Sequence, residues 1–365
     1  MEVKVAQLQA GCVTSKDVPG LTEVPLVKRN TVLDEVHLDF LKAFLVETVE
    51  VRPRLANGKT FIPGEVKEEP QAEEEKATSS RDTTLVEDYL ATVKMYKKLC
   101  GSWKEGAAVD MAAVRSTFLT LFEKTHHSPD YLLHLHDLND KTDYMYHHSV
   151  YVGMLSAFLA KKLRLTDERA NQVGLCGAMA DAGMVKLPSS ILRKTGSLTE
   201  EEYEKVKKHP IHSYKMLKDV PGVSDSMLVG VLQHHERYDG SGYPLGVTAE
   251  KIHLFSQIVA VADVYHAMIS ERHHRPKRSP FQVLEEIEKE RFGKLETKVV
   301  EALVQSFVQS AIGSRVCLST GEEAEVIFFD QQAPTRPMVK LLRDGTIIQL
   351  VQEPKLHIVE ILKKQ

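Results

Sequence analysis

The feature that most constrains the fold is a long stretch of helical periodicity in the middle of the chain. Between Leu85 and about Ile312, apolar residues recur at the spacing of a helix face. Thr199 and Glu202 have the spacing of a capping box, and Ser279 before Pro280 is typical of a helix start. The expected helices are residues 145–163, 167–181, 199–208, 212–218, 224–236, 253–271, 281–291 and 296–311. The pattern predicts a mainly α domain at residues 85–312.

Both ends of the chain alternate apolar and polar residues instead, as strands do. Residues 1–62 are predicted to form a small β-rich domain with one amphipathic helix at residues 33–49. Six glutamates lie between Glu65 and Lys76, so residues 63–84 are predicted to be an exposed linker with no function beyond tethering. Residues 313–365 are predicted to form a β-meander, with strands at 315–318, 325–329, 338–342, 347–350 and 357–361.

Composition excludes several classes of protein. The 365 residues carry 47 basic and 51 acidic side chains, a net charge of −4, which argues against a general nucleic-acid coat. No segment has the roughly 18 uninterrupted apolar residues of a membrane span, and the amino terminus does not resemble a secretion signal. The 4 cysteines are far apart, as expected of reduced thiols. We expect a cytoplasmic protein without a polymeric nucleic-acid partner.

Ligand-type residues recur at the ends and on the inner faces of the expected helices. Any one of them is more often a satisfied core residue than a ligand, but imidazoles and carboxylates together bind iron, manganese, nickel or zinc. In a helical bundle such residues converge on one centre. The set consists of His148, Asp181, His209, His234, His235 and Asp263. It predicts a divalent metal site.

The most specific local string is HHERYDGSGYP at residues 234–244. Its two histidines end a helix, and Gly240 and Gly242 permit a tight turn before Pro244. A turn of this kind beside a metal can bring backbone amides close to a phosphate.

This string resembles the signature of HD-GYP proteins, a subfamily of HD-superfamily metal hydrolases associated with cleavage of cyclic di-GMP. The resemblance covers about 170 residues and implies an HD-domain helical bundle core. Its other segments are His148-Ser149-Val150, residues 177–188, the run from Lys194 to Thr199 with His209-Pro210, and residues 261–265. It implies a phosphodiesterase that yields pGpG or GMP from cyclic di-GMP or a related cyclic dinucleotide.

The HD motif departs from the family pattern of histidine–aspartate–isoleucine–glycine–lysine. Ala180 stands in place of the histidine, a metal ligand in the family, and Met184 in place of the lysine. Neither replacement can bind a hard cation or a phosphate well. The resemblance therefore implies one or two ions, with iron or manganese favoured, and reduced activity.

The resemblance also assigns roles to individual residues. Asp181, His209, His234 and His235 would hold one ion, and His148 and Asp263 would hold the other. His266 lies one turn after Asp263 and would either fill the vacancy or be a surface histidine; His147 is a weaker candidate. Catalytic roles fall to Asp181, Glu236 and Lys186, although Lys186 is also consistent with an exposed loop lysine. The expected substrate contacts are Arg237, Asp239, Gly240, Gly242, Tyr243, Pro244, Arg272, Arg275 and Lys277.

The basic cluster at residues 272–278 fits a phosphate site and a solvated helix end equally well. Two hypotheses follow for the whole chain. The first is a metal-dependent phosphodiesterase with reduced activity. The alternative is a catalytically inactive module that binds a cyclic dinucleotide or a signalling protein, and homodimerisation is left open. A helical scaffold without a small-molecule role is the weakest interpretation.

Overall fold

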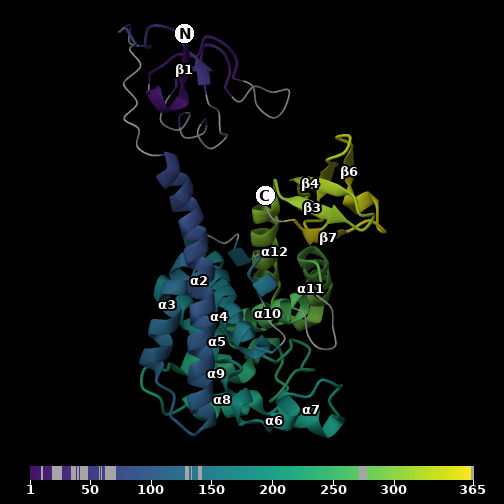
Figure 1. The fold of residues 1–365 in the computed structure, drawn as a ribbon. Helices are drawn as coiled ribbons and strands as arrows, with labels where there is room; N and C mark the ends of the chain where they lie inside the picture. The colour runs from purple at the N-terminus through teal and green to yellow at the C-terminus, as the bar shows by residue number, and fades with distance from the viewer. Residues whose placement is uncertain are drawn as a thin grey trace. The chain divides into compact units, whose positions relative to one another are not determined.

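The computed structural model divides the chain into two compact units, Met1–Arg81 and Asp82–Gln365. Figure 1 shows the helices and strands of both units. The structure describes residues 1–9, 11–18, 27–33, 38, 41, 48–56, 58, 60–61, 71–127, 131–132, 134–138, 142–270 and 278–362.

The amino-terminal unit has a small apolar core built from short extended segments. β1 (Glu2–Lys4) pairs antiparallel with β2 (Thr48–Glu50), and Val3 lies opposite Val49. η1 (Val5–Gln7) follows β1, and an isolated bridge joins Val13 to Val32. Most residues of the helix expected at 33–49 lie outside the described residues, so that helix stays a prediction.

The second unit is mainly helical, as predicted. Its elements are α2 (Gln71–Lys104), α3 (Met111–His127), η3 (Leu135–Leu138), α4 (Tyr144–Lys162), α5 (Asp167–Met179), η4 (Ala182–Lys186), α6 (Ser189–Leu192), α7 (Glu200–Val206), α8 (His209–Leu217), α9 (Asp225–Gln233), η5 (Ala249–Lys251), α10 (Leu254–Ile269), α11 (Pro280–Lys294) and α12 (Thr297–Ala311). None of the described helices combines the length and apolar character needed to span a lipid bilayer.

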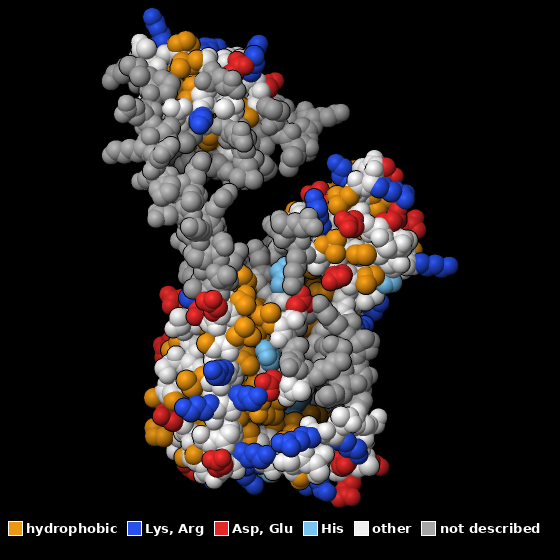
Figure 2. Space-filling model, in the orientation of Figure 1, with side chains coloured by type: hydrophobic (Ala, Val, Ile, Leu, Met, Phe, Trp, Pro, Cys, Tyr) orange, Lys and Arg blue, Asp and Glu red, His pale blue; other side chains and the backbone are white. Residues whose placement is uncertain are grey.

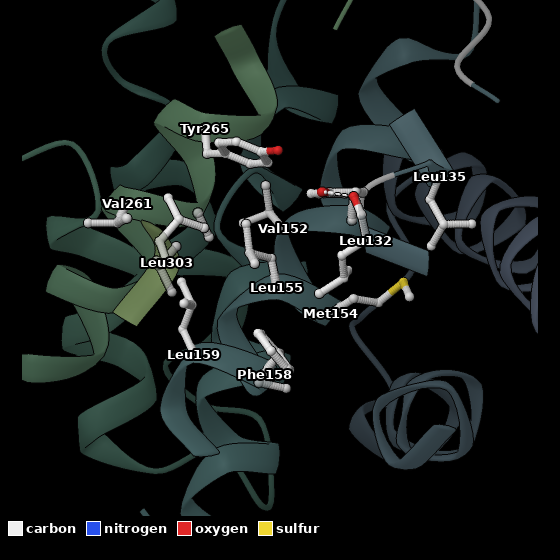
Figure 3. Close-up of a cluster of buried hydrophobic side chains, with 14 of the residues drawn as sticks. Leu132, Leu135, Val152, Met154, Leu155, Phe158, Leu159, Val261, Tyr265 and Leu303 are labelled. Atoms are coloured by element: carbon white, nitrogen blue, oxygen red, sulfur yellow. Dashed lines mark hydrogen bonds between the residues drawn. The ribbon is translucent and has the colours of Figure 1, made fainter. Parts of the chain in front are cut away.

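Helix α4 forms the centre of this unit. Every residue from His147 to Ala160 is buried, as expected of a helix that is covered on all sides. It packs against α5, α10, α3 and α12. Figure 3 shows Val152, Leu155 and Leu159 of α4 on the side of α10 and α12. This packing holds the amino-terminal end of α4, which carries His148, against α10, which carries Asp263.

Local signals at helix ends were predicted with mixed success. Thr199 and Glu202 form the expected capping box at α7. Ser279 and Pro280 occupy the N-cap and first-turn positions of α11, as predicted, but the Ser279 side chain makes no cap hydrogen bond. α2 begins at Gln71, so residues 71–84 of the expected linker are helical. Glutamate, alanine and lysine are good helix formers; residues 63–70 lie outside the described residues.

The carboxy-terminal strands form one antiparallel sheet in the order β6-β5-β4-β3-β7. They are β3 (Arg315–Leu318), β4 (Glu323–Phe328), β5 (Met338–Leu341), β6 (Ile347–Gln349) and β7 (Ile358–Ile361), with η6 (Leu350–Gln352) between the last two. The first four form the predicted meander, and β7 returns to pair with β3 at the edge of the sheet. Arg336 joins the sheet to α11 through an ion pair with Glu285.

Candidate metal centre

Four ligand-type residues meet at one point in the helical unit. Asp181 lies directly after α5, His209 is the first residue of α8, and His234 and His235 follow the last turn of α9. One ligand atom from each side chain lies within 4.8 Å of those of the other three. The three histidines lie 28 to 54 positions after Asp181 in the chain, and they are brought together with it because helix ends converge, as in other bundle-core metal sites.

Gly183 determines how closely α8 approaches Asp181. A Cβ atom at this position would lie 2.3 Å from the carbonyl oxygen of His209 and 2.4 Å from the amide nitrogen of Ser213. The Gly183 amide donates to Ser213 Oγ at 2.7 Å, and that hydroxyl donates to the carbonyl oxygen of Ala180 at 2.7 Å. The absence of a side chain at Gly183 therefore permits the contact that places His209 beside Asp181.

Backbone carbonyls fix the orientation of two of the histidines. His209 Nδ1 lies 2.7 Å from the carbonyl oxygen of Val206, and His234 Nδ1 lies 2.7 Å from that of Val231. A carbonyl oxygen only accepts, so each Nδ1 carries a proton and each neutral ring presents a lone pair at Nε2. This is the arrangement that holds metal-binding histidines in other proteins.

The lone pairs of these rings point at one another. The two Nε2 atoms of His209 and His234 are 3.3 Å apart, and Asp181 Oδ1 lies 3.0 Å from the first and 3.6 Å from the second. Three acceptor atoms at these distances repel unless a proton or a cation lies among them. Two nitrogens that bind one tetrahedral ion at about 2.0–2.1 Å are roughly 3.3 Å apart. The donor set therefore fits a divalent ion.

Electrostatics favour a positive charge at the same point. Burial raises the pKa of Asp181, but attraction to His209 and hydrogen bonds from His209 and His234 outweigh burial and hold that pKa well below its usual range. Burial lowers the pKa of His209, but the charge of Asp181 more than compensates and raises it. Burial, with the neighbouring His234, lowers the pKa of His235 strongly, so that ring stays neutral. If no cation is bound, a proton on His209 that is shared with Asp181 relieves the repulsion among these acceptor atoms.

A second group of predicted ligands adjoins the first. His148 Nε2 lies 2.9 Å from Asp263 Oδ1 and 3.6 Å from Asp181 Oδ2. Asp181 thus presents Oδ1 to the first group and Oδ2 to the second, as a bridging carboxylate would. Burial raises the pKa of Asp263, but His148 and His235 lower it by a larger amount. Ala180, which precedes Asp181, has no ligand atom to add.

The structure contradicts both expectations for His266, a ligand that fills the vacancy and a surface histidine. It is fully buried, so it is not a surface histidine. Its Nδ1 lies 2.9 Å from Nδ1 of His148, on the opposite edge of that ring from Asp263, so it contacts a candidate ligand rather than the ion position. His147 turns away from the centre, because its Nδ1 is 3.0 Å from the hydroxyl of Tyr89.

Glu236 holds the loop that follows the two histidines. Its side chain is 2% exposed, and its carboxylate oxygens accept from the amides of Leu245 at 2.7 Å and Val247 at 3.1 Å. The catalytic role expected for Glu236 is therefore replaced by a structural one. Arg237 likewise donates to the carbonyl oxygens of Glu236 and His234, at 2.8 and 3.3 Å, instead of facing outward.

The same loop places Tyr243 at the edge of the centre. The ring centroids of Tyr243 and His235 are 4.7 Å apart, and the Tyr243 amide donates to the carbonyl oxygen of His235. Gly242 makes this return possible, since a Cβ there would lie 2.4 Å from the Arg237 amide nitrogen. Gly240 has a positive φ of 76°, and Asp239 caps the turn by accepting from Ser241. Pro244 follows Tyr243 in the chain.

The predicted basic contacts are only partly described. Lys186 Nζ donates to the carbonyl oxygen of Trp103 at 2.7 Å, so Lys186 neither replaces the lysine missing at Met184 nor lies free in a loop. Arg272, Arg275 and Lys277 lie outside the described residues, and their substrate contacts stay predictions.

Three residues of the site escaped the sequence analysis. Gly183 and Ser213 set the approach of α8, and Tyr144 places its hydroxyl 3.1 Å from His148 Nδ1. Tyr144 lies one turn before His148, and Ser213 lies one turn after His209. The helical spacing of Tyr144 and Ser213 from a candidate ligand is therefore the signal from which both could have been predicted.

Comparison with known proteins identifies the helical domain. Residues 135–298 match the HD domain family. The chain is 33% identical over 253 residues to a cyclic di-GMP phosphodiesterase of Pseudomonas aeruginosa, covering 69% of this chain and 59% of that protein. It is 28% identical over 202 residues to cyclic di-GMP phosphodiesterase PdeB of Borreliella burgdorferi, covering 55% and 53%. It is 35% identical over 170 residues to 3'3'-cGAMP-specific phosphodiesterase 1 of Vibrio cholerae, covering 46% and 39%.

Among solved structures, Bd1817, an HDG"Y"P protein of Bdellovibrio bacteriovorus, aligns with a TM-score of 0.43 and 15% identity over 83% of this chain and 97% of that one. The chain spans between 39% and 59% of the lengths of the three curated relatives. The family match and the histidine–aspartate centre define an HD-domain protein. The HD motif of this domain carries Ala180 and Met184, and the chain is similar in sequence to cyclic di-GMP phosphodiesterases.

Proposed function

We propose that the chain is a metal-dependent phosphodiesterase that hydrolyses a cyclic dinucleotide, with cyclic di-GMP as the first candidate substrate. The convergence of two Nε2 atoms and Asp181 on one point carries this proposal, because such a donor set has no other stable occupant than a proton or a cation. The names of the relatives support the substrate class, since they act on cyclic di-GMP or 3'3'-cGAMP.

Each residue of the centre would have a separate role in hydrolysis. Asp181, His209, His234 and His235 would hold the ion, which we propose to be iron or manganese because oxygen and imidazole donors suit both. A bound divalent ion would supply Lewis-acid activation of the attacking water and stabilise charge on the phosphodiester. Asp181 stays ionised because its pKa is held low, so it can orient that water.

Tyr243 would contact the substrate. Burial raises the pKa of its hydroxyl, which therefore stays protonated and donates a hydrogen bond to a phosphate oxygen. Figure 2 shows lysine and arginine side chains over the part of the helical unit formed by α6, α7 and α8. Lys208 directly precedes His209, whereas the charge of Lys207 is paired with Glu204. Positive charge near the centre favours a ligand with two phosphodiester charges.

We propose reduced activity, because Ala180 removes one ligand of the second ion position and no described lysine replaces Met184. This observation also favours the alternative, a module that binds the dinucleotide without cleaving it. The test is turnover of cyclic di-GMP and of 3'3'-cGAMP with added Mn²⁺ or Fe²⁺, followed by separation of linear products.

The natural chain is expected to form pGpG or GMP slowly, and His209→Ala to form none. His147→Phe, a change one residue from His148 but outside the centre, serves as the control for folding. Binding of the dinucleotide by the natural chain with no product at any metal concentration would replace the enzyme proposal with the binding module. Neither binding nor product would contradict both.

A further inference from the structure

The histidines of the centre differ in what holds their Nδ1 atoms. In His209 and His234 the partner is a backbone carbonyl, which only accepts and so leaves Nε2 free to bind an ion. In His148 the partners are Nδ1 of His266 at 2.9 Å and the hydroxyl of Tyr144 at 3.1 Å. Both of these groups can donate or accept. The orientation of the proton on His148 is therefore not fixed by the backbone.

Two imidazole nitrogens 2.9 Å apart share one proton, which gives two arrangements. When His148 donates to His266, Nε2 of His148 presents a lone pair toward Asp263 Oδ1 at 2.9 Å and Asp181 Oδ2 at 3.6 Å. When His266 donates instead, Nε2 of His148 carries the proton and donates to Asp263. The first arrangement leaves a second ion position open, and the second arrangement closes it.

The surroundings of His266 hold its ring beside His148. The ring is fully buried and lies 4.4 Å, centroid to centroid, from the ring of Tyr151. Ser270 Oγ lies 3.3 Å from both ring nitrogens of His266, and a hydroxyl can donate or accept. These contacts keep His266 Nδ1 within reach of His148 Nδ1 in both arrangements.

We propose that His266 is a positioning residue that selects between these arrangements and so decides whether His148, Asp263 and Asp181 accept a second ion. The inference rests on the proposed function, because it concerns the same metal centre. It predicts that a group at position 266 that only accepts opens the second position. A group that neither donates nor accepts leaves the Tyr144 hydroxyl as the partner of His148 Nδ1; a phenol hydroxyl donates to an imidazole nitrogen more readily than it accepts, and this donation closes the position.

Two substitutions separate these cases. In His266→Asp a carboxylate oxygen takes the place of Nδ1, since both atoms are bonded to Cγ, and it can only accept from His148. In His266→Phe the buried ring is retained but both nitrogens are lost. His147→Phe is the matched control, because His147 is also a buried histidine, contacts Tyr89 and lies outside the centre.

The first measurement is titration of each metal-free protein with Mn²⁺, with the EPR spectrum recorded at each step. Partners of ligand histidines typically change metal affinity by 10- to 100-fold. We expect His266→Asp to bind the second equivalent about 10- to 100-fold more tightly than the natural chain and to give the signal of a coupled manganese pair. We expect His266→Phe to keep only the first equivalent and the signal of a single ion.

The second measurement needs no metal. Spectra of ¹⁵N-histidine-labelled, metal-free protein report which nitrogen of His148 carries the proton. We expect the Nδ1–H form in His266→Asp and the Nε2–H form in His266→Phe. The same tautomer in both variants, or the same Mn²⁺ stoichiometry and affinity in both, would overturn the inference. Should the natural chain bind metal yet leave cyclic dinucleotides intact, the proposed function fails while these two measurements still decide the role of His266.

Discussion

At the scale of single residues, the centre depends on the small residues Gly183 and Ala180 as much as on the ligands themselves. Gly183 has no side chain where His209 and Ser213 pass within 2.3–2.4 Å of a Cβ position. Ala180 likewise lacks the imidazole that its position in the HD motif would supply. The first absence brings two ligands together, and the second leaves one donor fewer beside His148 and Asp263.

We expect Gly183→Ala to weaken both stability and metal binding. Backbone atoms of α8 cannot move aside as a flexible side chain would, so overpacking here should cost about 1–3 kcal/mol and shift His209 away from Asp181. Gly196→Ala is the matched control, because nothing lies within 4 Å of a Cβ there. Denaturant unfolding and Mn²⁺ titration measure both effects. Equal behaviour of the two variants would contradict the role given to Gly183.

Restoring the HD motif tests the reason for reduced activity. We expect Ala180→His combined with Met184→Lys to raise turnover of cyclic di-GMP, because it returns one ligand and one phosphate contact to the motif. His209→Ala in the same background should abolish the gain. If the combined change leaves turnover unaltered, the cause lies elsewhere in the centre.

At the scale of elements, helix ends carry the chemistry. α9 begins at a cap in which Ser224 accepts from the Met227 amide, and it ends directly before His234 and His235. Of the four ligands of the first group, three come from the ends of two helices, α8 and α9, and the fourth is Asp181, the residue that opens η4. Fraying at the capped end of α9 would therefore displace His234 and His235 at its other end.

We expect Ser224→Ala to lower the free energy of unfolding by about 0.5–2 kcal/mol, the usual contribution of a serine cap. Ser279→Ala is the control, since Ser279 occupies a cap position without making a side-chain cap hydrogen bond. That variant should be neutral or slightly more stable. Urea denaturation of both proteins measures the difference, and an equal loss in both would refute the cap argument.

At the scale of the whole molecule, the cysteines differ in how deeply they are buried. Cys100 and Cys176 are buried in the helical unit, whereas Cys317 on β3 is half-buried. Burial raises the pKa of the Cys100 thiol to about 12 and also raises that of Cys176. Buried tyrosines, among them Tyr89 and Tyr265, are shifted in the same direction by the same cause.

We therefore expect stability to fall as pH rises above the ordinary thiol pKa of about 9. Below that pH the thiols are protonated in both states. Above it the unfolded chain ionises first, which favours unfolding until the folded thiol also titrates near pH 12. Denaturation midpoints at pH 8 and pH 10.5 measure this loss, and Cys100→Ala should reduce its slope. Iodoacetamide at pH 8 should modify Cys317 before Cys100; the reverse order would contradict this assignment of burial.

The sequence by itself determined the mainly α core, the strand positions, the capping box at Thr199 and the identity of the candidate ligands, because each depends on spacing within one short segment. Only the tertiary structure decided what each polar side chain faces. Glu236 and Lys186 have the chemistry of catalytic groups, yet backbone atoms occupy both: amides of the following loop for Glu236 and the carbonyl oxygen of Trp103 for Lys186. His266 lies one turn from Asp263, yet it contacts His148 of α4. The partners of Lys186 and His266 come from segments far apart in the chain, and only the packing of helices brings them together.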